Sequence, residues 1–181
     1  IFANRKADII KFIPEKSYDM IDKNIKTNSV ISKAYNKDTK NLDENYFLAE
    51  IQKFLTKTEA EDLLRKVKAS RAAKDKDYAT YEKLTLEMYK DYAGKSSEEL
   101  NEAAWSFFEN VKTKSSLETA LKWAQESVKK SENSANTDTL ANLYNKLGDK
   151  ANAKIWAQKS IDLAKKEGGD YADTEKLLKS I

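Results

Sequence analysis

The sequence contains no cysteine and no histidine, and these two absences exclude several kinds of chemistry. Without cysteine there is no disulfide, no thiolate nucleophile and no CxxC redox motif. Without histidine the chain lacks the side chain that most often acts as a general base near neutral pH, and carboxylates remain as the main ligands for a metal ion. We therefore expect a protein that is not an enzyme, with no catalytic residue, no cofactor and no metal site.

Proline and glycine are scarce, with one proline and four glycines in 181 residues. Hydrophobic residues make up 40% of the chain and charged residues 35%. This composition disfavours a loop-rich β sandwich and favours long helices, and the length suits one domain. The predicted fold class is all-α.

Long apolar runs and blocks of like charge are also missing. No segment approaches the roughly 18 consecutive apolar residues that a membrane span needs. The 33 basic and 30 acidic residues are interleaved, which is typical of solvated helix faces. We expect no membrane span and no nucleic-acid partner. The chain begins at Ile1 rather than at methionine, which indicates a mature form or a fragment.

Apolar residues recur at helical spacing through most of the chain. Capping boxes are expected at Asn41/Glu44, Thr58/Glu61, Ser96/Glu99 and Ser115/Glu118. The segment "ADIIKFI" within residues 1–13 fits a short helix or a strand, and we favour the helix. The predicted helices span 15–26, 29–36, 42–55, 58–74, 77–93, 97–112, 116–131, 136–147, 150–167 and 170–180.

Two similar segments, "LKWAQESV" and "KIWAQKSI", point to an internal repeat. Their tryptophans, Trp123 and Trp156, are 33 residues apart. The same shift places Ser127 on Ser160 and, in the preceding helices, Phe107 on Leu140. A period near 34 with alanines at fixed positions is typical of a two-helix repeat whose helices approach closely.

These residues resemble the tetratricopeptide repeat (TPR) family. The match runs through Leu140-Ala141, Tyr144, Gly148, Ala153 and Ala157, while Lys165 stands where the family has proline. The resemblance implies a right-handed stack of antiparallel helical hairpins, a TPR-like α-solenoid, with a less regular helical N-terminal part. We expect one continuous domain, divided into an irregular segment 1–57 and a repeat region 58–181. The repeat region comprises a degenerate unit 58–93, units 101–133 and 134–167, and a capping helix 170–181.

The C-terminal half is also similar to the helical region that follows the thioredoxin-like domain in certain bacterial envelope proteins. The matching residues include Asp138-Thr139, Leu147-Gly148, Gly168 and Asp170-Tyr171. This resemblance favours the bacterial periplasm or cell envelope over the cytoplasm. It carries over no catalytic residue, because the redox CxxC would lie outside this chain.

In a TPR-like stack, one side of the first helix of each repeat faces a concave groove. Trp105 lies at such a position, whereas Trp123 and Trp156 are expected to pack between repeats. Asn142 and Asn145 fit either a peptide backbone or solvent, and we favour solvent. Asp138 and Glu109 disfavour a site for a C-terminal carboxylate. The candidate groove residues are Glu102, Trp105, Glu109, Asp138, Asn142 and Asn145.

The predicted function is a non-catalytic module that binds a protein or peptide, with an assembly or adaptor role. One alternative is an accessory C-terminal domain of a thioredoxin-like oxidoreductase. Another is a subunit interface, for which weak self-association into a homo-oligomer would be the sign.

Overall fold

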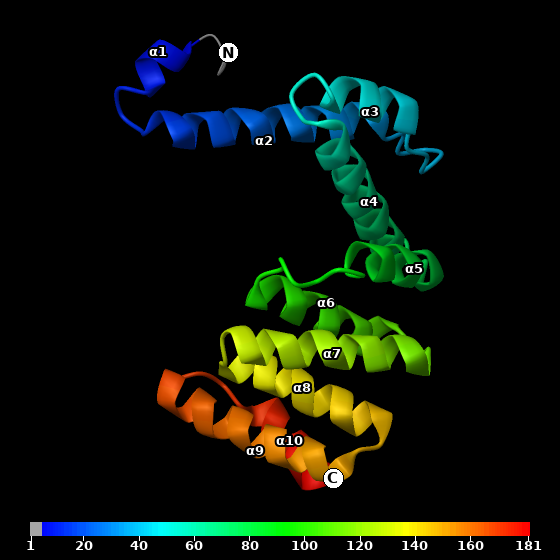
Figure 1. Ribbon diagram of the computed structural model, residues 1–181, viewed down its shortest axis with the longest axis vertical. Coiled ribbons are helices and arrows are strands. Elements are labelled where there is room, and N and C mark those ends of the chain that lie inside the picture. The colour runs from blue at the N-terminus through cyan, green and yellow to red at the C-terminus, as the bar shows by residue number, and fades with distance from the viewer. Residues whose placement is uncertain (1–4) are drawn as a thin grey trace. The chain divides into compact units, whose positions relative to one another are not determined.

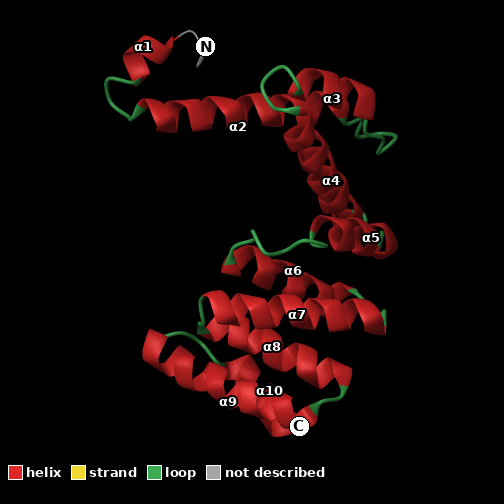
Figure 2. Cartoon of the chain, viewed as in Figure 1, coloured by secondary structure: helices red, strands yellow, loops and turns green. Residues whose placement is uncertain are grey.

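The computed structural model describes residues 5–181, which form ten helices and no strand (Figures 1 and 2). The all-α prediction is confirmed for these residues. The helices are α1 (Lys6–Ile9), α2 (Glu15–Ala34), α3 (Glu44–Ile51), α4 (Lys57–Lys74), α5 (Tyr78–Met88), α6 (Ser97–Asn110), α7 (Lys114–Lys130), α8 (Ser134–Leu147), α9 (Lys150–Glu167) and α10 (Ala172–Ser180).

The chain divides into two compact units, the first ending at Arg71 and the second spanning Ala72–Ile181. The division falls within α4. The sequence places a boundary between residues 57 and 58 inside one continuous domain, and that organisation stays a prediction.

The first unit is built around Phe47 and Ile51 of α3, both fully buried. They pack with Val30 and Ala34 of α2 and with residues of α4. The predicted ranges 15–26 and 29–36 form the single helix α2, so the expected break between them was wrong. Packing of the C-terminal half of α2 against this core outweighs the weak helix propensity of the intervening Thr27 and Asn28.

The start of the first unit is helical only over a short stretch. Residues 1–4 lie outside the described part of the chain, and α1 is followed by turns up to residue 13. The ammonium of Lys6 is 2.9 Å from a carboxylate oxygen of Glu15 and 2.8 Å from one of Asp19. The first residues of "ADIIKFI" lie in α1, so the helix prediction holds for them and the strand alternative does not apply.

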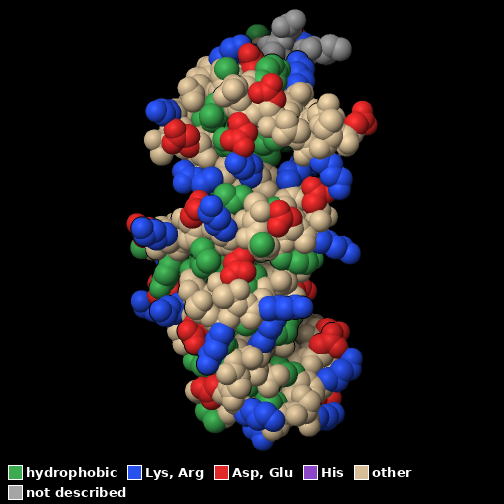
Figure 3. All heavy atoms as spheres, turned by 90° about the vertical axis from the view of Figure 1, so that its right-hand side faces the viewer, with side chains coloured by type: hydrophobic (Ala, Val, Ile, Leu, Met, Phe, Trp, Pro, Cys, Tyr) green, Lys and Arg blue, Asp and Glu red, His purple; other side chains and the backbone are tan. Residues whose placement is uncertain are grey.

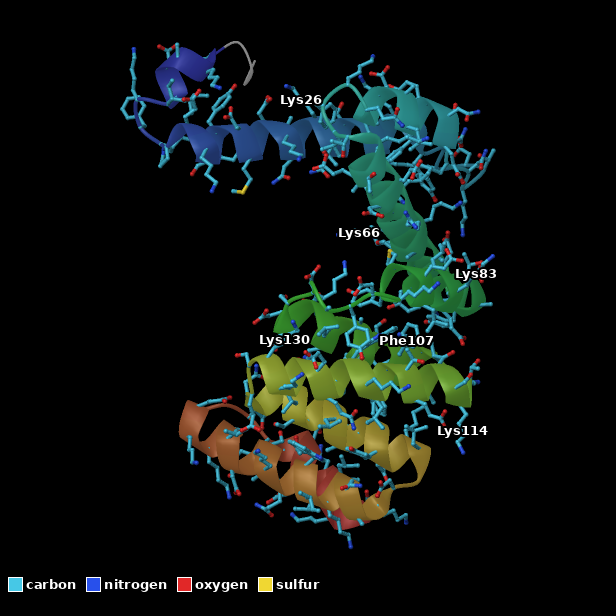
Figure 4. All side chains as sticks on the ribbon, in the orientation of Figure 1. Lys26, Lys66, Lys83, Phe107, Lys114 and Lys130 are labelled. Carbon is cyan, nitrogen blue, oxygen red and sulfur yellow. The ribbon has the colours of Figure 1, made fainter. Side chains whose placement is uncertain are left out.

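The second unit packs its helices mainly in sequence order. α6 packs on α7, α7 on α8 and α8 on α9, while α6 also contacts α8 and α10 contacts α9. Its core includes the fully buried side chains of Leu100, Phe107, Trp123 and Leu140. Figure 4 shows Phe107 between α6 and α7.

Tyr81 of α5 and Tyr89, which directly follows α5, pack against this core. The Tyr81 ring centroid lies 5.9 Å from that of Phe107, and the Tyr89 ring centroid lies 5.1 Å from that of Trp123. Tyr81 also donates a hydrogen bond of 2.7 Å to Ser106. Burial raises the pKa of Tyr89 to about 12, so its hydroxyl stays neutral.

Three buried polar side chains, the Ser97–Ser127–Asn136 cluster, join α6, α7 and α8. The Ser97 hydroxyl lies 2.9 Å from the Ser127 carbonyl oxygen, and the Ser127 hydroxyl donates to the Ser97 carbonyl at 2.8 Å. The Asn136 amide donates to the Ser127 hydroxyl at 3.1 Å and to the Ser131 carbonyl at 2.7 Å. Because these polar groups satisfy one another away from water, the cluster favours one relative position of the three helices.

A similar bond recurs in the next helix pair, but at a different spacing. The Ser160 hydroxyl of α9 donates to the Ser134 carbonyl of α8 at 2.9 Å. Ser97 and Ser127 are 30 residues apart, whereas Ser134 and Ser160 are 26 apart. A shift of 33 residues superposes Ser127 on Ser160. The starts of α6 and α8 are farther apart than this shift by about one helical turn, so the same shift does not superpose them.

Side-chain caps begin several helices. The predicted Ser96/Glu99 capping box is confirmed at α6. At α4 the reciprocal bonds join Thr56 and Glu59 rather than the predicted pair two residues later. Helix α8 has a capping box between Asn133 and Asn136 that was not predicted, because asparagine rather than an acid occupies its last position.

Gly148 ends α8 in the left-handed conformation, with φ of 91°. A Cβ atom there would meet nothing within 4 Å, so only the backbone angle opposes a side chain. We expect Gly148→Ala to lower the free energy of unfolding of the second unit by roughly 1 kcal/mol. The matched control is Gly94→Ala, since Gly94 has equal space and no positive φ. Urea unfolding followed by tryptophan fluorescence should show little loss, or a slight gain, for the control; equal losses in both variants would contradict the explanation.

Candidate functional site

The six predicted groove residues lie on two helices of the second unit. Glu102, Trp105 and Glu109 lie on α6, and Asp138, Asn142 and Asn145 lie on α8. Each set is spaced by three or four residues, so each shares one side of its helix. The two sets differ in their surroundings.

On α6 the candidate residues remain accessible to a partner. Trp105 is half-buried, and its ring centroid lies 5.0 Å from that of Phe108. Glu102 and Glu109 are exposed. The result is an aromatic pair with a carboxylate on the turn before Trp105 and another on the turn after it.

Lys146 of α8 contacts this aromatic pair, although it is not among the predicted groove residues. Its ammonium donates a hydrogen bond to the Phe108 carbonyl and lies 5.2 Å from the centre of the Phe108 ring. Burial lowers the pKa of Lys146, and the charge of nearby Lys112 lowers it further. In the sequence, a lysine in the last turn of α8 indicates only the end of that helix. Its contact with α6 could not be predicted, because it depends on how the two helices pack.

On α8 two of the three candidate residues form side-chain hydrogen bonds within the chain. The Thr174 hydroxyl of α10 donates to one carboxylate oxygen of Asp138 at 2.6 Å, and the Asn142 amide donates to the other at 3.1 Å. Burial raises the pKa of Asp138, against the lowering effect of these two hydrogen bonds. Asn145 is half-buried and forms no side-chain hydrogen bond with the described residues. The structure thus brings Asp138 and Asn142 together, with Asp138 also bonded to α10.

The tryptophans of the repeated segments lie in or against the core. Trp123 is fully buried, with its ring centroid 4.9 Å from that of Phe107. Trp156 is half-buried, packs against the same core and has the Lys159 ammonium 5.1 Å from its ring centre. For both tryptophans, packing between helices explains the position better than a role in binding a ligand.

A small hollow of about 260 Å³ lies beside Asp138, and Asp170 and Asp173 also line it. Within residues 5–181 no group of three or more acidic side chains is arranged to hold a metal ion. The charges elsewhere are mixed: Figure 3 shows basic and acidic side chains interspersed over the face that it draws. Three aspartates therefore give the lining of this hollow an acidic character.

None of the helices described between residues 5 and 181 is long and apolar enough to cross a membrane. Comparison of the chain with models of protein families gave no match. Searches of curated proteins and of solved structures likewise gave no match.

Proposed function

We propose that the second unit is a non-catalytic protein-binding module built on TPR-like repeats. In this proposal, α6 with α7 and α8 with α9 are two antiparallel hairpins of a short solenoid. The repeated tryptophan and serine positions of α7 and α9 support it, as do the capping boxes at the starts of α6 and α8. The role would be that of an adaptor or assembly factor.

The observation that carries the proposal is the aromatic pair of Trp105 and Phe108 on α6, with Lys146 beside it. Tryptophan is among the residues that contribute most binding energy at protein interfaces, because it buries a large area and offers one hydrogen-bond donor. Glu102 and Glu109 flank the pair and favour basic residues in the partner. We therefore propose a partner segment with an apolar anchor and nearby lysine or arginine.

We propose the partner site on α6 rather than on α8 because Asp138 of α8 already forms a hydrogen bond with Thr174 of α10. A ligand at Asp138 would have to replace the hydrogen bond from Thr174. Asp138 also opposes an acidic ligand. The exposed carboxylates and the aromatic pair of α6 require no such displacement.

The test is affinity capture from an extract of the source cell, followed by binding measurements with the purified partner. We expect Trp105→Ala to weaken binding of that partner about tenfold or more. The matched control is Trp156→Ala, which removes another half-buried tryptophan but from α9. Equal effects of the two changes, or none from Trp105→Ala in a protein with an unchanged circular dichroism spectrum, would contradict the proposal.

A further inference from the structure

The first unit contains a groove between α2 and α3 that the proposed function does not use. Its volume is about 480 Å³, within the usual range for ligand sites. Ile25, Val30 and Phe54 form its apolar lining. Its lysines come from both sides: Lys26 and Lys33 from α2, and Lys53 from the turn after α3; Lys26 is labelled in Figure 4.

Exposed apolar side chains continue from this groove toward the start of α2. Among residues 5–181 six large hydrophobic side chains are exposed, and five of them precede residue 26. Ile21 and Ile25, which are 38% and 47% exposed, lie one turn apart on the same side of α2. Ile21 therefore extends the exposed apolar surface beyond the groove by one turn of α2, and neighbouring exposed apolar side chains favour an interaction surface.

The charges that line the groove are mainly positive. Lys26, Lys33 and Lys53 face one acid, Glu50. The Lys26 ammonium is 2.6 Å from Asp22 and that of Lys53 is 2.5 Å from Glu50, whereas Lys33 forms no ion pair within residues 5–181. The groove therefore has an unbalanced positive charge beside an apolar surface.

We propose that the α2–α3 groove binds an amphipathic helix of a protein partner that has large apolar side chains on one face and acidic residues beside them. The acids would meet Lys33 and its neighbours, and the apolar side chains would cover Ile25 and Phe54. A helix is favoured over an extended peptide because the walls of the groove are helices, whose backbone groups bond internally and offer no strand edge to pair with. Ser29, a small residue in the lining, permits close approach of the partner.

This proposal concerns the first unit and does not rest on the proposed function of the second. The probe is a fluorescein-labelled, alanine-based helical peptide with leucines on one face and glutamates flanking them. Two control peptides carry lysine in place of the glutamates, or alanine in place of the leucines. Fluorescence anisotropy with the full chain should show binding of the first peptide only, and added salt should weaken it.

Variants of the chain locate the site. Lys33→Glu and Ile25→Ser should each weaken binding of the acidic peptide about tenfold or more. The matched control Lys16→Glu reverses another exposed lysine of α2 that does not line the groove, and it should leave binding nearly unchanged. Trp105→Ala should also leave it unchanged, which separates this test from the one on α6.

Several outcomes would overturn the proposal. These are tight binding of the lysine peptide, no binding of the acidic peptide, or equal effects of Lys33→Glu and Lys16→Glu. Sedimentation of the chain alone provides a further check. Concentration-dependent self-association that Ile25→Ser abolishes would assign the groove to a second copy of the chain.

Discussion

Replacing Trp123 with alanine should lower the free energy of unfolding of the second unit by about 3–5 kcal/mol. Trp123 is fully buried, and its ring contacts those of Phe107 and Tyr89. Its removal leaves a cavity where α5, α6 and α7 pack together, and helices cannot close such a space without moving. The loss is expected to be among the largest that any single substitution causes in this chain.

Tryptophan fluorescence is a suitable measurement, because all three tryptophans belong to the second unit. After the substitution, Trp105 and Trp156 still report unfolding in urea. Trp156→Ala, which removes a half-buried side chain, should cost only about 1–2 kcal/mol.

Trp123→Phe serves as a milder companion variant in case the alanine variant does not fold. It keeps an aromatic ring in the core and removes an indole nitrogen that has no hydrogen-bond partner among the described residues. We expect it to be clearly more stable than the alanine variant. A Trp123→Ala protein as stable as Trp156→Ala would show that Trp123 is not the centre of the core.

Replacing Asn136 with alanine should lower the same free energy by about 2–3 kcal/mol. The change removes the amide donor from the fully buried Ser127 hydroxyl and from the Ser131 carbonyl. It also removes the capping bond in which the side-chain amide oxygen of Asn136 accepts from the backbone N–H of Asn133. Each of these lost hydrogen bonds contributes about 0.5–1.5 kcal/mol, so together they account for the expected loss.

Asn136→Asp tests this explanation without creating a cavity. Aspartate has the same shape but donates no hydrogen bond, so it should destabilise the unit at least as much as alanine at neutral pH. Asn145→Ala is the control on the same helix and should change the free energy of unfolding by less than about 0.5 kcal/mol. If Asn136→Ala matched this control, the Ser97–Ser127–Asn136 cluster would have no role in stability.

The sequence predicted the helical fold because its signals are local. Apolar spacing located every helix from residue 42 onwards, and the scarcity of proline and glycine excluded other classes. The burial of Trp123 also followed from local information, since a tryptophan repeated beside small alanines must lie where helices approach closely. The merging of two predicted helices into α2 shows the limit, because the buried partners of Val30 and Ala34 come from α3 and α4.

Contacts between distant residues could not be predicted in this way. Asp138 and Thr174 are 36 residues apart, and Phe108 and Lys146 are 38 apart. Both contacts depend on how whole helices pack, so the sequence could select the candidate side of α8 without showing that α10 lies against it. The Ser97–Ser127–Asn136 cluster was missed for a related reason: serine and asparagine at helix ends look the same in sequence whether they are buried or exposed.

The unequal spacing of the serine pairs, 30 residues in one helix pair and 26 in the next, bears on how this chain tolerates insertions. Four added residues turn a helix by about 40° beyond one full turn, so nearly the same side of it stays buried. Two added residues would turn it by about 200° and bring the core side chains to the surface. Lengthening of α7 or α9 should therefore succeed in steps of one turn and fail at half a turn, which gives a practical rule for inserting tags or reporter segments into this unit.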